Sequence, residues 1–171
     1  MSFRISRWLL AGTALVVCAC GSTASGGAAL TPSATPTPLP STPAPTPNLL
    51  ANASAAYLAA ATTANAADNA LAKTFCGKTT YTTAQAKTCW PKYAAIEQTF
   101  LTAIYAIQYP PAMKVDVDAQ ITAVTKIIQG EGALAVSPSD IAAFNAWRTD
   151  TTAGVGAANI VRHDLGLPQV K

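Results

Sequence analysis

The sequence predicts an all-α protein, a four-helix up-down-up-down bundle behind a disordered tether rich in Pro, Thr and Ser. From residue 48 onward, alanine is abundant and apolar residues recur at the three- and four-residue spacing of amphipathic helices. Four such segments of similar length are separated by short joins with helix start and stop signals. Short joins favour antiparallel neighbours, and no segment has the alternating pattern of a β-strand.

The first predicted helix runs from about residue 48 to Phe75. Its apolar stripe combines positions seven apart with interleaved alanines: Leu50, Ala53, Tyr57, Ala60, Ala64, Ala67 and Leu71. The sequence CGKTTYTT then breaks the pattern.

The second predicted helix has a start signal at Thr82–Gln85, which has the spacing of a capping box. We expect Pro91 to interrupt a short turn there, with the main helix following it. The stripe of this helix is Tyr93, Ile96, Phe100, Ile104 and Ile107. The sequence YPPA ends it, because a residue before proline disfavours the helical conformation.

The third predicted helix covers about Pro111–Leu134, with a stripe of Met113, Val117, Ile121, Val124 and Ile128. The sequence SPSD predicts the start of the fourth, with Ser137 as its cap and Pro138 in its first turn. Its stripe is Ile141, Phe144, Trp147, Thr151, Val155, Ala158 and Leu165. The sequence LGLP stops it, because Gly166 can adopt the left-handed conformation.

The chain begins MSFRISRWLLAGTALVVCACG, in which Arg4 and Arg7 precede an apolar run from Trp8 to Ala19. That run has the length of the apolar region of an export signal and is too short to span a membrane. The stretch VCAC at its end, Val17–Cys20, resembles the bacterial lipobox, in which an aliphatic and two small residues precede the cysteine that receives lipid.

The resemblance implies a bacterial lipoprotein in which residues 1–19 are the signal peptide and Cys20 is acylated, typically with palmitate. Two or more acyl chains anchor a protein stably, so the membrane would be a partner through a covalent lipid anchor. The expected location is extracytoplasmic, anchored to the bacterial cell membrane. The alternative is ordinary secretion without lipid.

Residues 20–47 form the predicted lipid-anchored linker, and residues 48–168 form the helical bundle domain. Seven of the twelve prolines fall between Thr31 and Pro47, which favours polyproline II over a packed core. At ~3.1 Å per residue, this part would hold the bundle roughly 50 Å from the bilayer. The linker is a plain spacer or, alternatively, a stalk that carries sugars.

Charge and cysteine content set further limits. Arg4 and Arg7 are two of the eleven basic residues, which leaves nine basic against eight acidic residues after cleavage. This near-neutral balance argues against a nucleic-acid partner. With Cys20 acylated, Cys76 and Cys89 remain as an even pair in an oxidising compartment, so we predict that they form a disulfide.

Residues for catalysis or metal binding are scarce. The chain has one histidine, His163, and two glutamates, Glu97 and Glu131, without the Glu-x-x-His pairs of ferritin-like sites. It also lacks the Gly-x-Ser-x-Gly elbow of hydrolases and a glycine-rich phosphate loop after a strand. We therefore predict a non-enzymatic protein with no catalytic residues, no metal site and no cofactor, and we expect His163 at the surface.

Three charged residues fall on or beside apolar stripes. On a helical wheel, Asp68 lies on the stripe of the first helix, and Arg148 and Arg162 lie at or beside that of the fourth. If these helices are antiparallel neighbours, Asp68 pairs with Arg148 or joins a small polar core network. The alternative is that these side chains extend to solvent separately.

Two tryptophans are candidates for a contact surface, but each has a structural alternative. Trp147 is expected in the core, and Trp90, beside Cys89, is expected to pack on the disulfide. The sequence NIVRHDLGLP, Asn159–Pro168, is similar to the C-terminal end of other small exported bacterial proteins, and this resemblance implies no activity.

The favoured function is a membrane-anchored lipoprotein that presents its bundle to a protein or cell-wall partner. The alternative is a small-ligand or cofactor binder with an inter-helix pocket near Arg148 or Arg162, because alanine-rich stripes can leave a slot between helices. A sealed apolar core would argue against the binder. A pocket that contains one of these arginines without a carboxylate partner would favour it.

Overall fold

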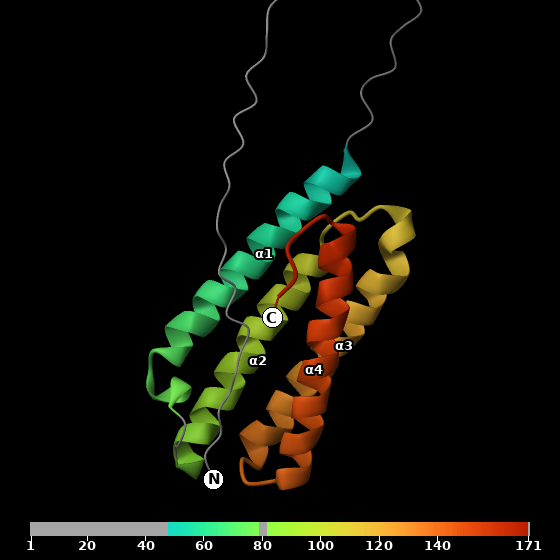
Figure 1. Cartoon of the computed structure of the whole chain (residues 1–171). Coiled ribbons are helices and arrows are strands. Elements are labelled where there is room, and N and C mark those ends of the chain that lie inside the picture. The colour runs from blue at the N-terminus through green and yellow to red at the C-terminus, as the bar shows by residue number, and fades with distance from the viewer. Residues whose placement is uncertain (1–47, 79–81, 171) are drawn as a thin grey trace, which may run out of the picture. The chain divides into compact units, whose positions relative to one another are not determined.

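The computed structural model describes residues 48–78 and 82–170. These residues form four long helices and two single 3₁₀ turns: α1 (Leu49–Ala72), η1 (Phe75–Gly77), α2 (Thr83–Tyr105), η2 (Pro111–Met113), α3 (Lys114–Val136) and α4 (Ile141–Asp164). Consecutive long helices run in opposite directions, so the all-α up-down-up-down prediction is confirmed (Figure 1). The signal peptide, Cys20 and the tether lie outside the described residues.

Side-chain caps fix three of the helix starts. Asn48 caps α1, and Thr82 with Gln85 forms the predicted capping box of α2, with N–H···O distances of 2.8 and 3.2 Å. Asp140, and not Ser137, caps α4 by accepting the N–H of Ala143 at 3.0 Å. The carboxylate therefore sets the start of α4, while Ser137 ends α3.

The prediction that Pro91 interrupts the second helix is wrong, because Pro91 lies inside the continuous helix α2. Proline removes one backbone donor, but the first turns of α2 are held in other ways. The capping box closes the first turn, and Cys89 and Trp90 are buried in the core directly before the proline.

Each helix packs mainly on its neighbour in sequence: α1 on α2, α2 on α3 and α3 on α4. Direct contact between α1 and α4 is slight. The bundle is therefore closed along three of its four seams and looser along the fourth, between its first and last helices (Figure 1).

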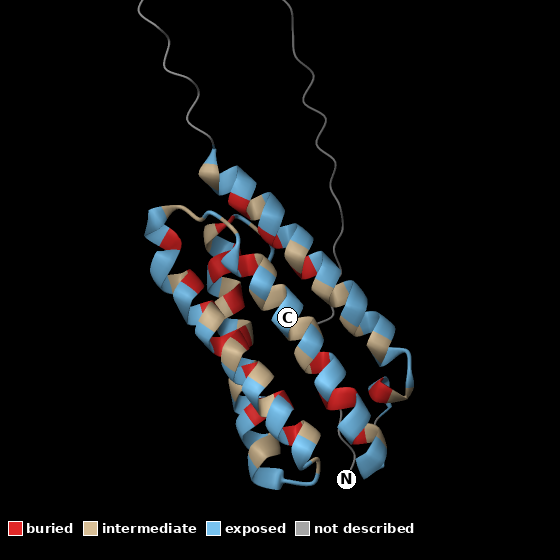
Figure 2. Cartoon of the chain, turned by 180° about the vertical axis from the view of Figure 1, so that it is seen from behind, coloured by how far each residue is buried: buried red, intermediate tan, exposed pale blue. Residues whose placement is uncertain are grey.

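Buried side chains form inward-facing stripes on all four helices (Figure 2). They divide into two clusters. The Tyr57 cluster contains Ala53, Tyr57, Ala61, Ile104, Met113, Val117, Val161 and Leu165. The tryptophan cluster contains Cys76, Ala86, Cys89, Trp90, Tyr93, Ile127, Leu134 and Trp147. In α1 the buried stripe follows a spacing of four from Ala53 to Ala61, so Leu50, expected inside, is 45% exposed.

Threonine side chains on the helices bond back to their own chain. Eight threonine hydroxyls donate to the carbonyl four residues earlier: Thr88, Thr99, Thr102, Thr122, Thr125, Thr149, Thr151 and Thr152. Each hydroxyl proton is thereby used inside its own helix. None of the helices within 48–78 and 82–170 combines the length and hydropathy needed to cross a bilayer.

Candidate functional site

A cavity of about 90 Å³ lies inside the bundle, lined by residues of all four helices and by Val170 near the chain end. Its walls are mainly small or apolar side chains, among them Ala61, Ala64, Val124, Ile127, Gly154 and Ala158. The members of this set on α1 and α4 are three alanines and a glycine. These small side chains do not fill the space between α1 and α4, two helices that have slight direct contact. The slot therefore follows from small residues on two facing helices.

Gly154 also lets α4 approach α3. A Cβ atom at this position would lie 2.8 Å from Cδ1 of Ile127. The glycine is thus part of the cavity wall and part of the tight α3–α4 seam. Gly156, two residues further along α4, has open space around its Cβ position.

One end of the cavity holds a buried hydrogen-bonded pair, Gln120 and Tyr57. Nε2 of Gln120 donates to the Tyr57 hydroxyl at 2.6 Å, and Gln120 is only 1% exposed. Within the described residues, Oε1 of Gln120 has no hydrogen-bond partner. Reversing the amide exchanges its two polar atoms, so one of them remains unpaired in either orientation. Burial raises the pKa of the Tyr57 phenol, although the Gln120 bond and the nearby Arg162 charge oppose this.

Arg162 lies at the same end and is 4% exposed. Its Nε donates to the backbone carbonyl of Pro168. In the part of the chain that the structure describes, no carboxylate lies within ion-pair distance of its guanidinium. Burial lowers the pKa of Arg162, and the electrostatic interaction with Tyr57 opposes that shift. The cavity thus contains a nearly buried cation with one backbone acceptor.

The three charged residues singled out in the sequence separate in the structure. Asp68 and Arg162 both line the cavity, and Glu97 joins them in its wall. Arg148 is exposed on α4 and does not line it. Pairing of Asp68 with Arg148 assumed close packing of α1 on α4, and these helices make little direct contact.

The C-terminal segment covers an edge of the cavity. Gly166 has φ 68°, and the N–H groups of Gly166 and Leu167 donate to the carbonyls of His163 and Arg162 at 2.9 and 2.7 Å. This Schellman motif ends α4, as the LGLP sequence predicts, and turns the chain back. The returning segment places Val170 in the cavity wall, and its main chain bonds to Asn159.

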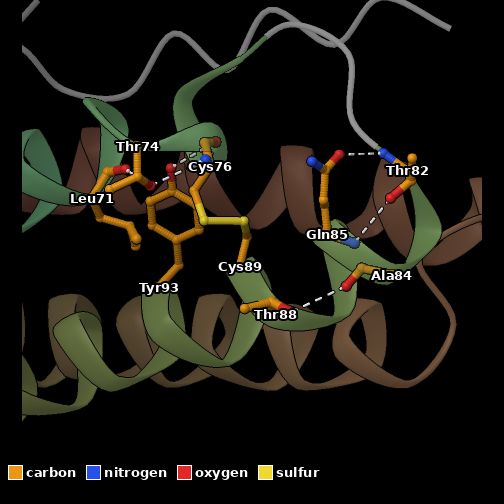
Figure 3. The surroundings of a disulfide bond; sticks show 9 residues. All are labelled: Leu71, Thr74, Cys76, Thr82, Ala84, Gln85, Thr88, Cys89 and Tyr93. Carbon is orange, nitrogen blue, oxygen red and sulfur yellow. Dashed lines mark hydrogen bonds between the residues drawn. A yellow bond between two sulfur atoms is a disulfide. The ribbon is translucent and has the colours of Figure 1, made fainter.

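The predicted disulfide joins Cys76 of η1 to Cys89 of α2, with Cα atoms 5.4 Å apart (Figure 3). The Tyr93 hydroxyl donates to the Cys76 carbonyl at 3.2 Å, beside the disulfide. Both cysteines are fully buried, so the bond holds the α1–α2 join against the tryptophan cluster. It lies outside the cavity lining.

The remaining candidates have structural places. Trp147 is buried, as predicted, and its ring meets that of Trp90 edge-on at a centroid distance of 5.0 Å. Trp90 belongs to the same cluster as the disulfide. His163 is exposed and contacts Asp164. Among the described residues, no three His, Cys, Asp or Glu side chains are grouped to hold a metal ion.

Sequence reasoning missed two fully buried polar residues, Gln120 and Glu131. A signal for Gln120 exists, because it falls between Val117 and Val124 at helical spacing and therefore on the inward face of α3.

Searches against profiles of known protein families, curated proteins and solved structures found no match to this chain.

Proposed function

We propose that this chain is a lipid-anchored, extracytoplasmic binding module that holds a small molecule in the cavity between α1 and α4, and that it acts by binding and not by catalysis. One observation carries the binding part: a cavity of about 90 Å³ whose lining includes Arg162 and Gln120, a residue with a polar atom that has no partner among the described residues. Buried polar groups normally find partners, and leaving them without one costs about 1–3 kcal/mol each. A ligand with matching groups recovers that energy.

The cavity has the composition of a binding site. Its lining is mostly apolar, with a few convergent polar groups that can orient a ligand. Its volume exceeds the roughly 10–15 Å³ that one water needs and is below the 150 Å³ of an engineered cavity that takes benzene. The ligand is therefore a molecule of only a few heavy atoms, or the small end of a larger one.

The anchoring part of the proposal rests on the resemblance of Val17–Cys20 to a lipobox after an apolar run. The Pro-rich linker supports it, because an extended spacer gives a tethered domain room to meet solutes away from the bilayer. The proposed anchoring and the proposed binding are compatible, but the first rests on the sequence of the chain start and the second on the cavity.

A fragment screen by ligand-observed NMR tests the binding function. Ala64→Leu adds bulk inside the cavity, whereas Ala66→Leu adds the same bulk at an exposed position of α1 outside it. We expect fragments that bind saturably to the natural protein and to Ala66→Leu, and that lose binding in Ala64→Leu. If no fragment distinguishes the two variants, the cavity is not a binding site, and a bundle that contacts a protein or cell-wall partner becomes the better proposal.

A further inference from the structure

We infer that the cavity binds a short-chain monocarboxylate, with the carboxylate against Arg162 and the apolar body along the small-residue walls. This inference rests on the proposed binding function and adds the chemical class of the ligand. Two features of the site support it: a buried cation without a carboxylate partner among the described residues, and an adaptable hydrogen-bonding pair beside it.

Arg162 supplies the charge. Its guanidinium carries five N–H donors, and the backbone carbonyl of Pro168 accepts from one of them. Removal of a charge from water is costly unless an opposite charge or several hydrogen bonds replace the solvent. Since no carboxylate of the described residues pairs with Arg162, a ligand carboxylate is the group that best completes it, through the fork geometry of an arginine–carboxylate pair.

Gln120 and Tyr57 supply the neutral contact. In the structure the amide donates to the phenol, and its oxygen has no hydrogen-bond partner among the described residues. If the phenol instead donates to the amide oxygen, the amide presents N–H, which is a donor for a carboxylate. The pair can therefore turn a donor toward an anion without moving any heavy atom beyond the exchange of the two amide atoms.

Arg162 is the one cationic side chain in the described cavity lining, so the site takes one negative group at one end. Tyr57 and Asp68 are eleven residues apart on α1, which is roughly 16 Å at about 1.5 Å per residue. Tyr57 interacts electrostatically with Arg162, so Arg162 and Asp68 belong to opposite ends of the slot. Between these ends Ala61, Ala64 and Ala158 offer apolar contact to the body of the ligand.

Calorimetric titration of the purified full chain, with tether and disulfide intact, tests the inference. Three probes share a carbon skeleton and differ in their head group: butyrate, butyramide and butylamine. We expect butyrate to bind at least tenfold more tightly than either of the others. Arg162→Met should weaken butyrate at least tenfold, Arg162→Lys should weaken it less, and Arg148→Met, at an exposed position outside the cavity, should leave it unchanged.

Two results would overturn the inference and leave the binding function standing. One is that butyramide or butylamine binds the natural protein as tightly as butyrate does, and that this binding is lost in Ala64→Leu. The other is that Arg162→Met, with the helix content and unfolding midpoint of the natural protein, binds butyrate normally. Failure of all three probes, together with an NMR screen that finds no fragment sensitive to Ala64→Leu, would overturn both proposals.

Discussion

The side-chain amide of Asn159 forms hydrogen bonds with both the N–H and the carbonyl group of Val170. Its Oδ1 accepts the Val170 N–H at 2.7 Å, and its Nδ2 donates to the Val170 carbonyl at 3.0 Å. The amide thus bonds to the main chain as a neighbouring β-strand would, and it holds Val170, the last described residue, against α4. Because Val170 lines the cavity, this contact also sets one of the cavity walls.

Asn159→Ala should release the C-terminal segment from α4. Loss of two hydrogen bonds should lower the free energy of unfolding by about 1–2 kcal/mol, and the C-terminus should become more sensitive to carboxypeptidase. Asn145→Ala, an exposed change on the same helix, serves as the control. Equal digestion rates for both variants would show that the clamp does not hold the segment.

Gly77→Ala should strongly destabilise the protein. A Cβ atom at Gly77 would lie 1.8 Å from the carbonyl oxygen of Ala72, so the backbone of the α1–α2 join must shift. We expect a loss of roughly 2 kcal/mol or more in urea unfolding. Gly132→Ala, in the exposed interior of α3 with nothing within 4 Å, should instead stabilise by about 0.5–1 kcal/mol.

Reduction of the Cys76–Cys89 disulfide should lower stability by roughly 3 kcal/mol in the chain-entropy account of a short loop. The measurement is urea unfolding with and without reductant. The double variant Cys76→Ala/Cys89→Ala provides a reductant-independent comparison. A midpoint that does not change on reduction would mean that the buried join is held by its packing alone.

Stability should fall at alkaline pH because of two buried phenols. Burial raises the pKa of Tyr57 and of Tyr109 above the ordinary value of about 10. Near pH 10 the unfolded chain begins to lose these phenol protons, while both phenols stay protonated in the folded chain. Their contribution to the free energy of unfolding is therefore complete below about pH 10 and decreases as the pH rises further. Urea unfolding between pH 8 and 11 should show this decline, and Tyr109→Phe should make it shallower. A decline of the same slope in Tyr109→Phe would rule out this phenol as a cause.

Cys20→Ala should move the protein from the membrane fraction to the soluble fraction, because the acyl chains are the proposed anchor. Mass spectrometry of the natural protein should find an acylated N-terminal Cys20. Cys18→Ala is the matched control and should leave fractionation unchanged, since Cys18 lies within the predicted signal peptide.

Local signals in the sequence were sufficient to predict the four helices, two of the helix caps and the disulfide. The Thr82–Gln85 box and the Gly166 stop depend on neighbouring residues only, so they are readable without tertiary structure. Pro91 and Ser137 misled the prediction because burial before Pro91 and the carboxylate of Asp140 outweighed the local preferences.

The cavity depends on features that periodicity does not encode. A wheel places Arg148 and Arg162 at similar positions, yet only Arg162 is buried, beside the returning C-terminal segment. That return depends on Asn159, a polar residue whose partner lies eleven positions away. The spacing of α1 from α4 likewise results from packing along the other three seams.

The threonines that bond to their own helices affect how the protein behaves in concentrated salt. With the hydroxyl proton engaged, such a side chain has no donor left for water, and only 11% of the chain is charged. Sulfate ions are excluded from weakly hydrated surfaces and favour their association. The bundle should therefore precipitate at a lower ammonium sulfate concentration than a highly charged helical protein of equal size.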